Sequence, residues 1–492
     1  MTAAENPLDR FARRFDRPDL VGWLRRGLIG DGMPVPGPFG TNPLLYADYV
    51  ASGRALEQVE QFVMTEVLPW YANSHTEASF CGSTMTRMRR AARGIIARMT
   101  GADDNHAVIF AGAGATAGIN RLVHLFGVPD ILARNGRAVV FVGPYEHHSN
   151  ILPWRESGAD VIEIPEAAGG GPDLDALARA LAETRGADLR IGAFSAASNV
   201  TGVITDVDAV TRLLNAHDVL SMWDYAGAGP YLPIDMKAGT DCAIDAVVIS
   251  PHKFIGGPGA SGVLIVRKDA VSRSRPVHPG GGTVRFVSPW GHVYAQGLVE
   301  REEAGTPNVV GDIRAAMVFI VKNAIGQQVM DTRHADFAAR AQQAWAKNPR
   351  LELLGIDKGP RLPIFAFRVR DARGGHVHHQ LFTRMLSDCY GIQARGGCAC
   401  AGPYAHRLLN IDAAQSDTMR DAILSGDEMA KPGWVRLNFS VLLDDAKADL
   451  IIRAVDELAR NPHPMADAYA ADFATARFAP TDSTSGARTA VA

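Results

Sequence analysis

The sequence contains few cysteines, no long apolar run and no large excess of charge of either sign. Its 492 residues include only five cysteines, an odd number spread along the chain. This excludes a framework of disulfides and suits a reducing compartment, so we expect a cytoplasmic protein. No stretch approaches the roughly 18 uninterrupted apolar residues of a membrane-spanning helix, and Met1–Arg26 lacks the apolar core of a signal peptide. The formal net charge of −3 favours neither nucleic acid nor an anionic membrane as a partner, so we expect a small-molecule ligand.

The sequence is rich in short apolar segments that alternate with glycine turns and helical stretches between Ala107 and Val266. Such alternation predicts an α/β fold with a mostly parallel sheet of the seven-stranded type. Ligands of such sheets bind at the carboxyl ends of the strands. The predicted strands are Ala107–Phe110, Ala138–Val142, Val161–Ile164, Arg190–Phe194, Val219–Trp223, Val247–Ser250 and Val263–Val266.

The rest of the pattern divides the chain into four segments. Residues 1–43 form an amino-terminal arm, residues 44–315 a large domain and residues 316–465 a smaller α/β domain. Residues 466–492 are rich in Ala, Ser and Thr and show no apolar periodicity from Phe473 onward, which predicts a disordered tail.

Lys253 follows the predicted strand Val247–Ser250 and precedes a glycine-rich turn. A lysine between apolar strands is partly desolvated, which lowers its pKa and frees the amine to attack a carbonyl. This placement favours Schiff-base chemistry. The alternative is a structural strand with an ordinary surface lysine at its end.

Three other strand ends carry groups that could meet Lys253 at the same edge of the sheet. Ala111–Asn120 is a glycine-rich helix start whose free N–H groups and Thr116 hydroxyl suit a phosphate. His147 follows the next strand and could stack on a flat ring and pass protons in catalysis, although it could equally satisfy a local backbone group. Asp224 ends an apolar strand and needs a partner, for which a protonated pyridine nitrogen is suitable.

Together these four features are what pyridoxal phosphate (PLP) requires. The motifs Tyr145–Trp154, Ser198–Gly202 and Glu303–Asn308 follow in an order that resembles the class V aminotransferase fold, an aspartate aminotransferase-like PLP-dependent transferase fold. Within that fold they resemble the cysteine desulfurase and selenocysteine lyase family. The resemblance covers roughly Leu44–Arg460.

The resemblance assigns roles to individual residues. It makes Lys253 the lysine that holds the cofactor, and it implies a homodimer because the neighbouring subunit offers its Thr306 to the phosphate. Asn199 and His75 would also contact substrate. The cofactor-binding residues that it implies are Ala115, Thr116, His147, Asn199, Asp224, Ala226, Ser250, His252, Lys253 and Thr306.

The substrate end is predicted from the smaller domain. Arg436 lies inside an apolar strand, where an unpaired guanidinium is costly, so either a carboxylate ligand or an internal Asp or Glu is expected to pair with it. By resemblance it binds the α-carboxylate of an amino acid. The loop Gln393–Tyr404 resembles the desulfurase cysteine loop and is similar to that of molybdenum-cofactor sulfurases, with Cys400 rather than Cys398 at the nucleophile's position. A thiolate there would become a persulfide.

A metal site is the weaker interpretation of the same loop. Cys398, Cys400 and His406 would need a fourth ligand that the sequence does not supply, so no metal is expected. The histidines at 376, 378 and 379 are better explained as a helix start.

The predicted function is removal of sulfur or selenium from L-cysteine or a cysteine derivative, with alanine as product. The sulfur acceptor could be another protein. The alternative is another class V enzyme, a C–S lyase, epimerase or aminotransferase, that lacks a catalytic cysteine. Two departures from the family pattern bear on the site. Gly227 stands where a glutamine usually contacts the cofactor, leaving Tyr225 or a water as a substitute, and Thr76 replaces an arginine after His75.

Overall fold

The structure is a computed structural model that describes residues 6–73 and 77–481. It consists of two compact units. The larger comprises Met1–Gly27, Ala51–Ser198 and Ile204–Gln328, and the smaller comprises Leu28–Val50, Asn199–Val203 and Val329–Ala492. The predicted boundary between residues 315 and 316 falls inside a helix, α11 (Val309–Ile325), and the predicted arm divides between the two units.

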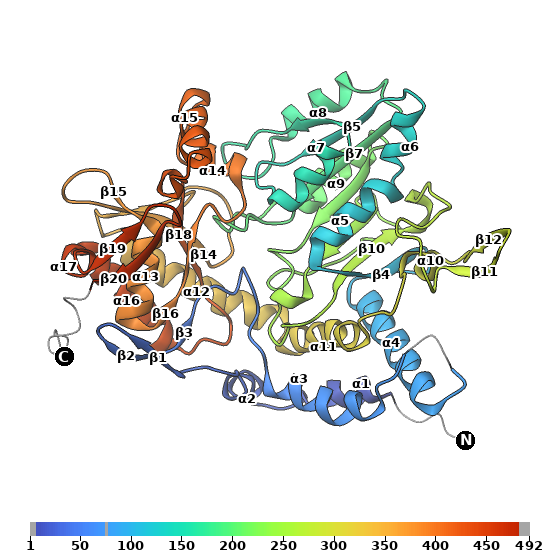
Figure 1. Ribbon diagram of the computed structural model, residues 1–492, viewed down its shortest axis with the longest axis horizontal. Coiled ribbons are helices and arrows are strands. Elements are labelled where there is room, and N and C mark those ends of the chain that lie inside the picture. The colour runs from blue at the N-terminus through green and yellow to red at the C-terminus, as the bar shows by residue number, and fades with distance from the viewer. Residues whose placement is uncertain (1–5, 74–76, 482–492) are drawn as a thin grey trace. The chain divides into compact units, whose positions relative to one another are not determined.

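The larger unit is built on a seven-stranded sheet in the order β4-β10-β9-β8-β7-β5-β6 (Figure 1). Only β10 runs antiparallel to its neighbours, which confirms the predicted mostly parallel α/β sheet. Its strands are β4 (His106–Gly112), β5 (Ala138–Val142), β6 (Asp160–Glu163), β7 (Leu189–Ser195), β8 (Leu220–Asp224), β9 (Ala246–Ile249) and β10 (Gly262–Arg267).

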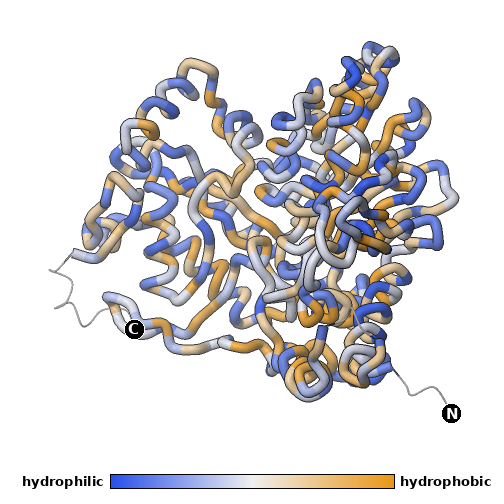
Figure 2. Tube along the Cα trace, turned by 45° about the vertical axis from the view of Figure 1, so that its right-hand side comes forward, coloured by the Kyte–Doolittle hydropathy of each residue, from blue (hydrophilic) through white to orange (hydrophobic). Residues whose placement is uncertain are grey.

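Helices cover both faces of this sheet because its strands are apolar on both sides. On one face Ile119 and Leu122 of α5 pack against Ile109, Val140 and Val248. On the other face the indole N–H of Trp223 donates to Thr211 of α9. In Figure 2 hydrophobic stretches of the chain are interspersed with hydrophilic ones, and many of the outer bends of the trace are hydrophilic.

The remaining elements of the larger unit surround this core. An exposed hairpin of β11 (Val284–Ser288) and β12 (Gly291–Tyr294) follows the sheet. The helices are α1 (Pro7–Arg13), α2 (Leu20–Arg26), α3 (Glu57–Phe62), α4 (Phe80–Met99), α5 (Gly114–Leu125), α6 (Val128–Ala133), α7 (Leu152–Glu156), α8 (Leu174–Glu183), α9 (Val207–Asn215), α10 (Leu298–Glu302) and α11. Side-chain N-caps fix several starts, such as Asp173 before α8 and Asp206 before α9.

The smaller unit has a sheet in the order β13-β14-β18-β17 with β15 paired to β14. Val435, Leu437 and Phe439 pack with the helices into one core, which leaves Trp434 and Arg436 on the other face of β18. The strands are β1 (Pro34–Gly37), β2 (Gly40–Pro43), β3 (Leu45–Tyr46), β13 (Leu351–Leu353), β14 (Ile364–Arg370), β15 (His376–Val377), β16 (Ile392–Gln393), β17 (Arg395–Gly397), β18 (Trp434–Asn438), β19 (Tyr469–Asp472) and β20 (Arg477–Pro480). The helices are α12 (Gln327–Trp345), α13 (His379–Tyr390), α14 (Gly402–Leu408), α15 (Ala413–Leu424), α16 (Asp445–Arg460) and α17 (His463–Ala466).

The predicted disorder from residue 466 is wrong for the described part of that segment. The strands β19 and β20 pair as a hairpin between Tyr469 and Pro480. Tertiary contacts hold it, because the Tyr469 hydroxyl donates to Asp388 at 2.8 Å and the Phe478 ring lies 5.2 Å from that of His378. Residues 482–492 lie outside the described residues. Among the described residues, no helix combines the length and apolarity needed to cross a bilayer.

Candidate active site

Four of the predicted residues follow strands that end at the same edge of the large sheet. β4, β5, β8 and β9 all run in one direction, so their carboxyl ends lie at the same edge of the sheet. Thr116 lies in the first turn of α5 after β4, and His147 follows β5. Asp224 is the last residue of β8, and Lys253 lies in the turn after β9. The topology therefore brings together the groups that the sequence placed in a single site.

The start of α5 forms a narrow cradle. The Ala115 N–H donates to the Ser250 hydroxyl at 3.0 Å, which joins the turn after β4 to the turn after β9. Gly114 has a φ of 63° and leaves little space, because a Cβ there would lie 2.9 Å from the His252 ring and 3.0 Å from Ser250 Oγ. Only glycine fits that position without displacing a neighbour, which gives the cradle its shape.

Thr116 and His147 are joined by Ser149, which sequence reasoning did not identify. The hydroxyls of Thr116 and Ser149 lie 2.7 Å apart, and the Ser149 N–H donates to Nδ1 of His147 at 3.1 Å. Because Nδ1 accepts this hydrogen bond, the neutral His147 ring carries its proton on Nε2. The sequence signal available for Ser149 was its place two residues after His147, where a side chain can return to the turn.

Asp224 is a buried carboxylate with an exposed fraction of 5%. Its Oδ1 accepts from the Ala226 N–H at 2.7 Å, so the backbone of Ala226 helps to hold the carboxylate in place. Burial raises the pKa of Asp224, while the Ala226 N–H and the positive charge of Lys253 act in the opposite direction. A cation facing this group would restore the ionised form.

Lys253 lies in a tightly packed turn and is partly buried. A Cβ at Gly257 would lie 2.2 Å from the carbonyl oxygen of Pro251, so the chain folds closely around this turn. Burial, followed by the charge of Lys253, lowers the pKa of His252, which is therefore neutral at pH 7. A neutral neighbour leaves Lys253 as the cation nearest to Asp224 in this turn.

Glu146 is a second buried carboxyl group at this edge, and sequence reasoning passed over it. Its exposed fraction is 2%, and it accepts hydrogen bonds from Asn150, from the Ser195 N–H at 2.9 Å and from the Ser195 hydroxyl at 2.6 Å. Burial raises its pKa to about 7, against the hydrogen bonds from Ser195 and Asn150 and with a smaller contribution from the charge of Asp224. Its place directly before His147 was the signal that could have identified it.

Tyr225 is one of the two substitutes that the sequence left open for the glutamine missing at Gly227. It lies one residue beyond the end of β8, and its N–H donates to the carbonyl oxygen of Val248 at 2.9 Å. Burial and the charges of Asp208 and Asp235 raise the pKa of the Tyr225 hydroxyl. The Tyr225 hydroxyl is therefore a buried, neutral group that feels the charges of Asp208 and Asp235.

Thr306 lies in an exposed segment that a buried ion-pair network anchors. Glu303 pairs with Arg89 and Arg93 of α4 and accepts from the Phe110 N–H at 2.8 Å. Burial would raise the pKa of Glu303, but the charges of the two arginines and these hydrogen bonds lower it overall. Thr306 is therefore exposed on a fixed segment.

In the smaller unit, Arg436 is paired inside the protein. Its guanidinium donates to Asp48 at 2.7 Å and to the carbonyl oxygen of Asn199 at 3.1 Å. Arg395 donates to the other oxygen of Asp48 at 2.9 Å. The internal acidic partner that the sequence left open is thus present, and the ion pairs of this cluster join two arginines to one carboxylate among the described residues.

Asn199 fastens the cysteine loop. Its side-chain amide donates to the carbonyl oxygen of Ala399 at 2.9 Å, while its Oδ1 is buried without a partner among the described residues. Ala399 and Cys400 have φ values of 54° and 56°, in the left-handed region that non-glycine residues rarely adopt. Cys400 is exposed and Cys398 is half-buried, so the strained turn presents Cys400 to solvent.

Two sequence expectations concern residues that the site does not include. His75 and Thr76 lie outside the described residues. Two of the three histidines near α13 form its start, because His379 is its first residue and Nδ1 of His378 accepts from the Gln380 N–H as an N-cap. The prediction is wrong for His376, which lies in β15 and pairs with Arg370 of β14. Within 6–73 and 77–481, no group of three or more His, Cys, Asp or Glu side chains could hold a metal ion.

Comparison with known proteins identifies the family. Residues 45–424 match the family described as aminotransferase class-V. A probable cysteine desulfurase from Vibrio cholerae is 28% identical over 422 residues, which cover 84% of this chain and 93% of that protein. A probable cysteine desulfurase from Halalkalibacterium halodurans is 26% identical over 74% of this chain and 85% of its own length.

Solved structures agree on the fold. The cysteine desulfurase CsdA from Escherichia coli superposes with a TM-score of 0.70 at 24% identity, covering 90% of this chain and 98% of that one. The apo cysteine desulfurase from Thermococcus onnurineus gives 0.69 at 22% identity, covering 85% of this chain and 95% of that one. The family match spans most of the chain and confirms the resemblance drawn from the motifs, so this protein belongs to the class-V aminotransferase family.

Proposed function

We propose that this protein is a PLP-dependent cysteine desulfurase that moves sulfur from L-cysteine, or a closely related cysteine derivative, onto Cys400. The observation that carries the proposal is the exposed Cys400 at the tip of a strained turn that Asn199 fastens. The names of the relatives from V. cholerae and E. coli support it.

The residues at the sheet edge fit PLP. The start of α5, with Gly114 in its cradle and the hydroxyls of Thr116 and Ser250 nearby, suits a phosphate. The His147 ring suits a flat heteroaromatic surface. Asp224 accepts one N–H from the protein through Oδ1, and its burial makes a cationic ring nitrogen a favourable partner for the carboxylate. When bound as a Schiff base with Lys253, PLP supplies an electron sink for the substrate's Cα.

The charge of the smaller unit's cluster fits one substrate carboxylate. Arg436 and Arg395 together carry two positive charges, and Asp48 supplies one negative charge. The cluster therefore retains a net charge of about +1, which an α-carboxylate would balance through charge-assisted hydrogen bonds. Arg436 is the better candidate for this contact because its side chain is 4% exposed and so loses little solvation on binding.

In the proposed reaction Lys253 takes the proton from Cα of the substrate and returns a proton to the product. The Cys400 thiolate attacks the substrate sulfur, and the bond between that sulfur and Cβ breaks. The carbon fragment is protonated and leaves as alanine, while Cys400 keeps the sulfur as a persulfide. A second thiol, for example on an acceptor protein, can then remove that sulfur.

The homodimer and the compartment are part of the same proposal. Side chains on the β11–β12 hairpin are unusually exposed for apolar residues, with exposed fractions of 59% for Phe286, 62% for Val287 and 93% for Trp290. Thr306 is exposed as well. A second copy of the chain would cover such apolar surface. All five cysteines are free, which supports a reducing compartment such as the cytoplasm.

The test is turnover of L-cysteine by the purified holoenzyme, with alanine, pyruvate and sulfide measured together. We expect alanine to match the sulfur released and Cys400 to gain about 32 daltons in the mass spectrum, the increment of one added sulfur atom. Cys400→Ala should abolish this activity, and Cys398→Ala is the matched control two residues away. Lys253→Ala should also be inactive. Pyruvate as the product, or full sulfide release by Cys400→Ala, would favour a C–S lyase without a catalytic cysteine.

A further inference from the structure

Two of the five cysteines lie in one tight turn, two residues apart. Cys398 follows β17, and its carbonyl oxygen accepts from the Ala401 N–H at 3.1 Å. The two residues at the centre of this turn, Ala399 and Cys400, have φ values of 54° and 56°. A four-residue turn with this hydrogen bond and a positive φ at both central positions is of type I′. Cys398 is therefore the first residue of the turn and Cys400 the third.

The turn brings the two cysteines within the range of a disulfide. Neighbouring Cα atoms are about 3.8 Å apart, so the bend of a β-turn leaves those of its first and third residues about 5 to 6 Å apart. Disulfides join residues whose Cα atoms lie about 4.4 to 6.8 Å apart. The backbone of the turn thus already gives Cys398 and Cys400 the separation that a disulfide between them needs.

Contacts on both sides of the turn fix its backbone. The Asn199 side-chain amide donates to the carbonyl oxygen of Ala399 at 2.9 Å. Before the turn Gly397 pairs with Trp434 of β18, and after it α14 begins at Gly402. Because these contacts involve the backbone of the turn, the two cysteine side chains can rotate toward each other without breaking them.

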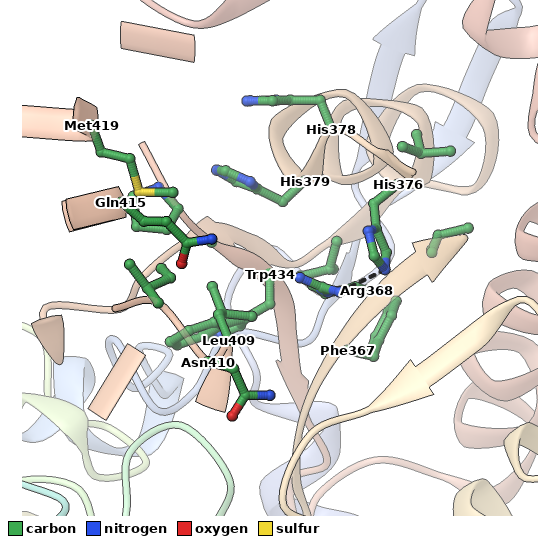
Figure 3. A pocket seen from close by; sticks show the side chains of 16 residues that line it. Phe367, Arg368, His376, His378, His379, Leu409, Asn410, Gln415, Met419 and Trp434 are labelled. Atoms are coloured by element: carbon green, nitrogen blue, oxygen red, sulfur yellow. Dashed lines mark hydrogen bonds between the residues drawn. The ribbon is translucent and has the colours of Figure 1, made fainter. Parts of the chain in front are cut away.

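Both thiols are accessible from the surface of the smaller unit. Cys400 is exposed and Cys398 is half-buried. Neither cysteine lines the cavity of about 350 Å³ in this unit, whose lining residues Figure 3 shows. A dissolved reagent therefore reaches the turn without entering that cavity, and it meets Cys400 first because Cys400 is the more exposed of the two.

The other three cysteines are separated from this pair. Cys242 is buried in the larger unit, and Cys81 lies in α4 of that unit. Cys389 lies in α13, where burial and then the charge of Asp388 raise the pKa of its thiol to about 12. Since the thiolate is the reactive form, Cys389 is a poor nucleophile at neutral pH.

We propose that Cys398 and Cys400 form a reversible redox switch, in which a low-molecular-weight disulfide oxidises the pair to an intramolecular disulfide. The Cys400 thiolate attacks one sulfur of the small disulfide, which gives a mixed disulfide and releases one small thiolate. The Cys398 thiolate then attacks the Cys400 sulfur, and the mixed disulfide breaks and releases the second small thiolate. The two protons that the cysteine thiols lose are taken up by the small thiolates. Two protein thiols are thus oxidised and one small disulfide is reduced to two thiols.

The disulfide removes the thiol that the proposed reaction uses. The oxidation of the pair needs no cofactor, whereas its effect on turnover rests on the proposed function. Only one residue separates the cysteines, so their disulfide closes a small ring, and strained, exposed disulfides are readily reduced. The pair therefore stays reduced while thiols are in excess and is oxidised when small disulfides accumulate.

The first test measures masses after the reduced full-length holoenzyme is incubated with glutathione disulfide. Trypsin leaves both cysteines on one peptide, residues 396–407. In the parent protein this peptide should lose about 2 daltons, the mass of two hydrogen atoms, and regain them with excess thiol. Cys398→Ser cannot complete the second step, so its Cys400 should keep a glutathione adduct of about 305 daltons. Cys389→Ser is the matched control and should behave as the parent does.

The result for the parent peptide decides the proposal even if Cys398→Ser does not fold. A glutathione adduct that persists on Cys400 of the parent, or a peptide whose mass does not change, would overturn the switch. Loss of the 2-dalton change in Cys389→Ser would overturn it as well, because the disulfide would then involve a different pair.

The second test compares alanine formation from L-cysteine before and after oxidation. Turnover by the parent should be lost when the pair is oxidised and should return after treatment with a phosphine reductant. Reduced Cys398→Ser should turn over at the parental rate. If the reduced parent does not turn over, the proposed function fails, and the masses still decide whether the pair is oxidised. Full turnover by the oxidised pair would overturn the switch, and Cys400→Ala would then show whether Cys400 takes part in the reaction.

Discussion

Replacement of Glu146 by glutamine should change how the stability of the protein depends on pH. The native pKa of Glu146 is about 7 and its ordinary value is 4.5, because burial disfavours the charged form. An unfolded chain thus loses the proton near pH 4.5, whereas the folded chain holds it up to about pH 7. A raised pKa means that stability is fully present below the unfolded value and is lost as pH rises through the folded one.

The magnitude follows from the two pKa values. Each unit of difference corresponds to about 1.4 kcal/mol, so ionisation of Glu146 should cost about 3 kcal/mol of unfolding free energy between about pH 5 and pH 8. Glu146→Gln cannot ionise and should lack this loss. The variant is also destabilised by an amount that does not depend on pH. Its NH₂ group must face N–H or O–H donors of Asn150 or Ser195, which the carboxyl group of Glu146 accepts as hydrogen bonds.

The assay is urea unfolding of both proteins at several pH values, followed by tryptophan fluorescence. The constant penalty shifts the variant equally at every pH, and all other titrating groups are common to the two proteins. The unfolding free energy of the variant should therefore rise by about 3 kcal/mol relative to that of the parent protein from about pH 5 to pH 8. If the difference between the two unfolding free energies stays constant over the whole range, Glu146 is already ionised at pH 5 in the folded protein and the reasoning is refuted.

Three further changes test other parts of the site. Asp48→Ala leaves the buried Arg436 without its carboxylate and should lower the unfolding free energy in urea by about 3 to 5 kcal/mol. Arg395→Ala removes a side chain that is 48% exposed and should lower it by less than about 1 kcal/mol. Equal losses for the two variants would contradict the buried pairing. Gly114→Ala forces a side chain to a φ of 63° and against a neighbouring ring, so we expect weaker PLP binding in an equilibrium titration, and an unchanged dissociation constant would show that the cradle is not used. The pKa of His379 is lowered in the folded protein, so acidification from about pH 6.5 toward pH 4 protonates this histidine in the unfolded chain first and reduces stability. His379→Gln should therefore lose less unfolding free energy over this pH range than the parent protein. Equal losses of unfolding free energy in the two proteins would contradict this.

The sequence predicted the large sheet well because its strands are apolar on both faces and glycine turns separate them. The boundaries differ by one or two residues where the hydrogen-bond ladder extends beyond the apolar run, as at Asp224, which pairs with Ser195 inside the sheet. The smaller unit was harder to predict. Its tail hairpin is held by Tyr469 and Phe478 through contacts with residues far away in the sequence, and no local pattern encodes them.

The candidate site shows the same division between local and distant information. Motif order was sufficient to bring Thr116, His147, Asp224 and Lys253 to one edge, since parallel strands align their ends. The partner of Arg436 is Asp48, 388 positions away, and composition alone could say only that a buried guanidinium needs some carboxylate.

Glu146 illustrates why a motif-based description of this site is electrostatically incomplete. The side chain of Asp224 is the carboxylate that the proposed chemistry needs in its ionised form, and Lys253 favours that form. Glu146 interacts with Asp224 through their like charges, which contribute to its own raised pKa. Since such repulsion acts on both groups, a protonated Glu146 favours ionisation of Asp224, and an ionised Glu146 opposes it. We therefore expect the charge of Asp224 to depend on the protonation of Glu146, in addition to the burial, the Ala226 N–H and the Lys253 charge that act on its own pKa.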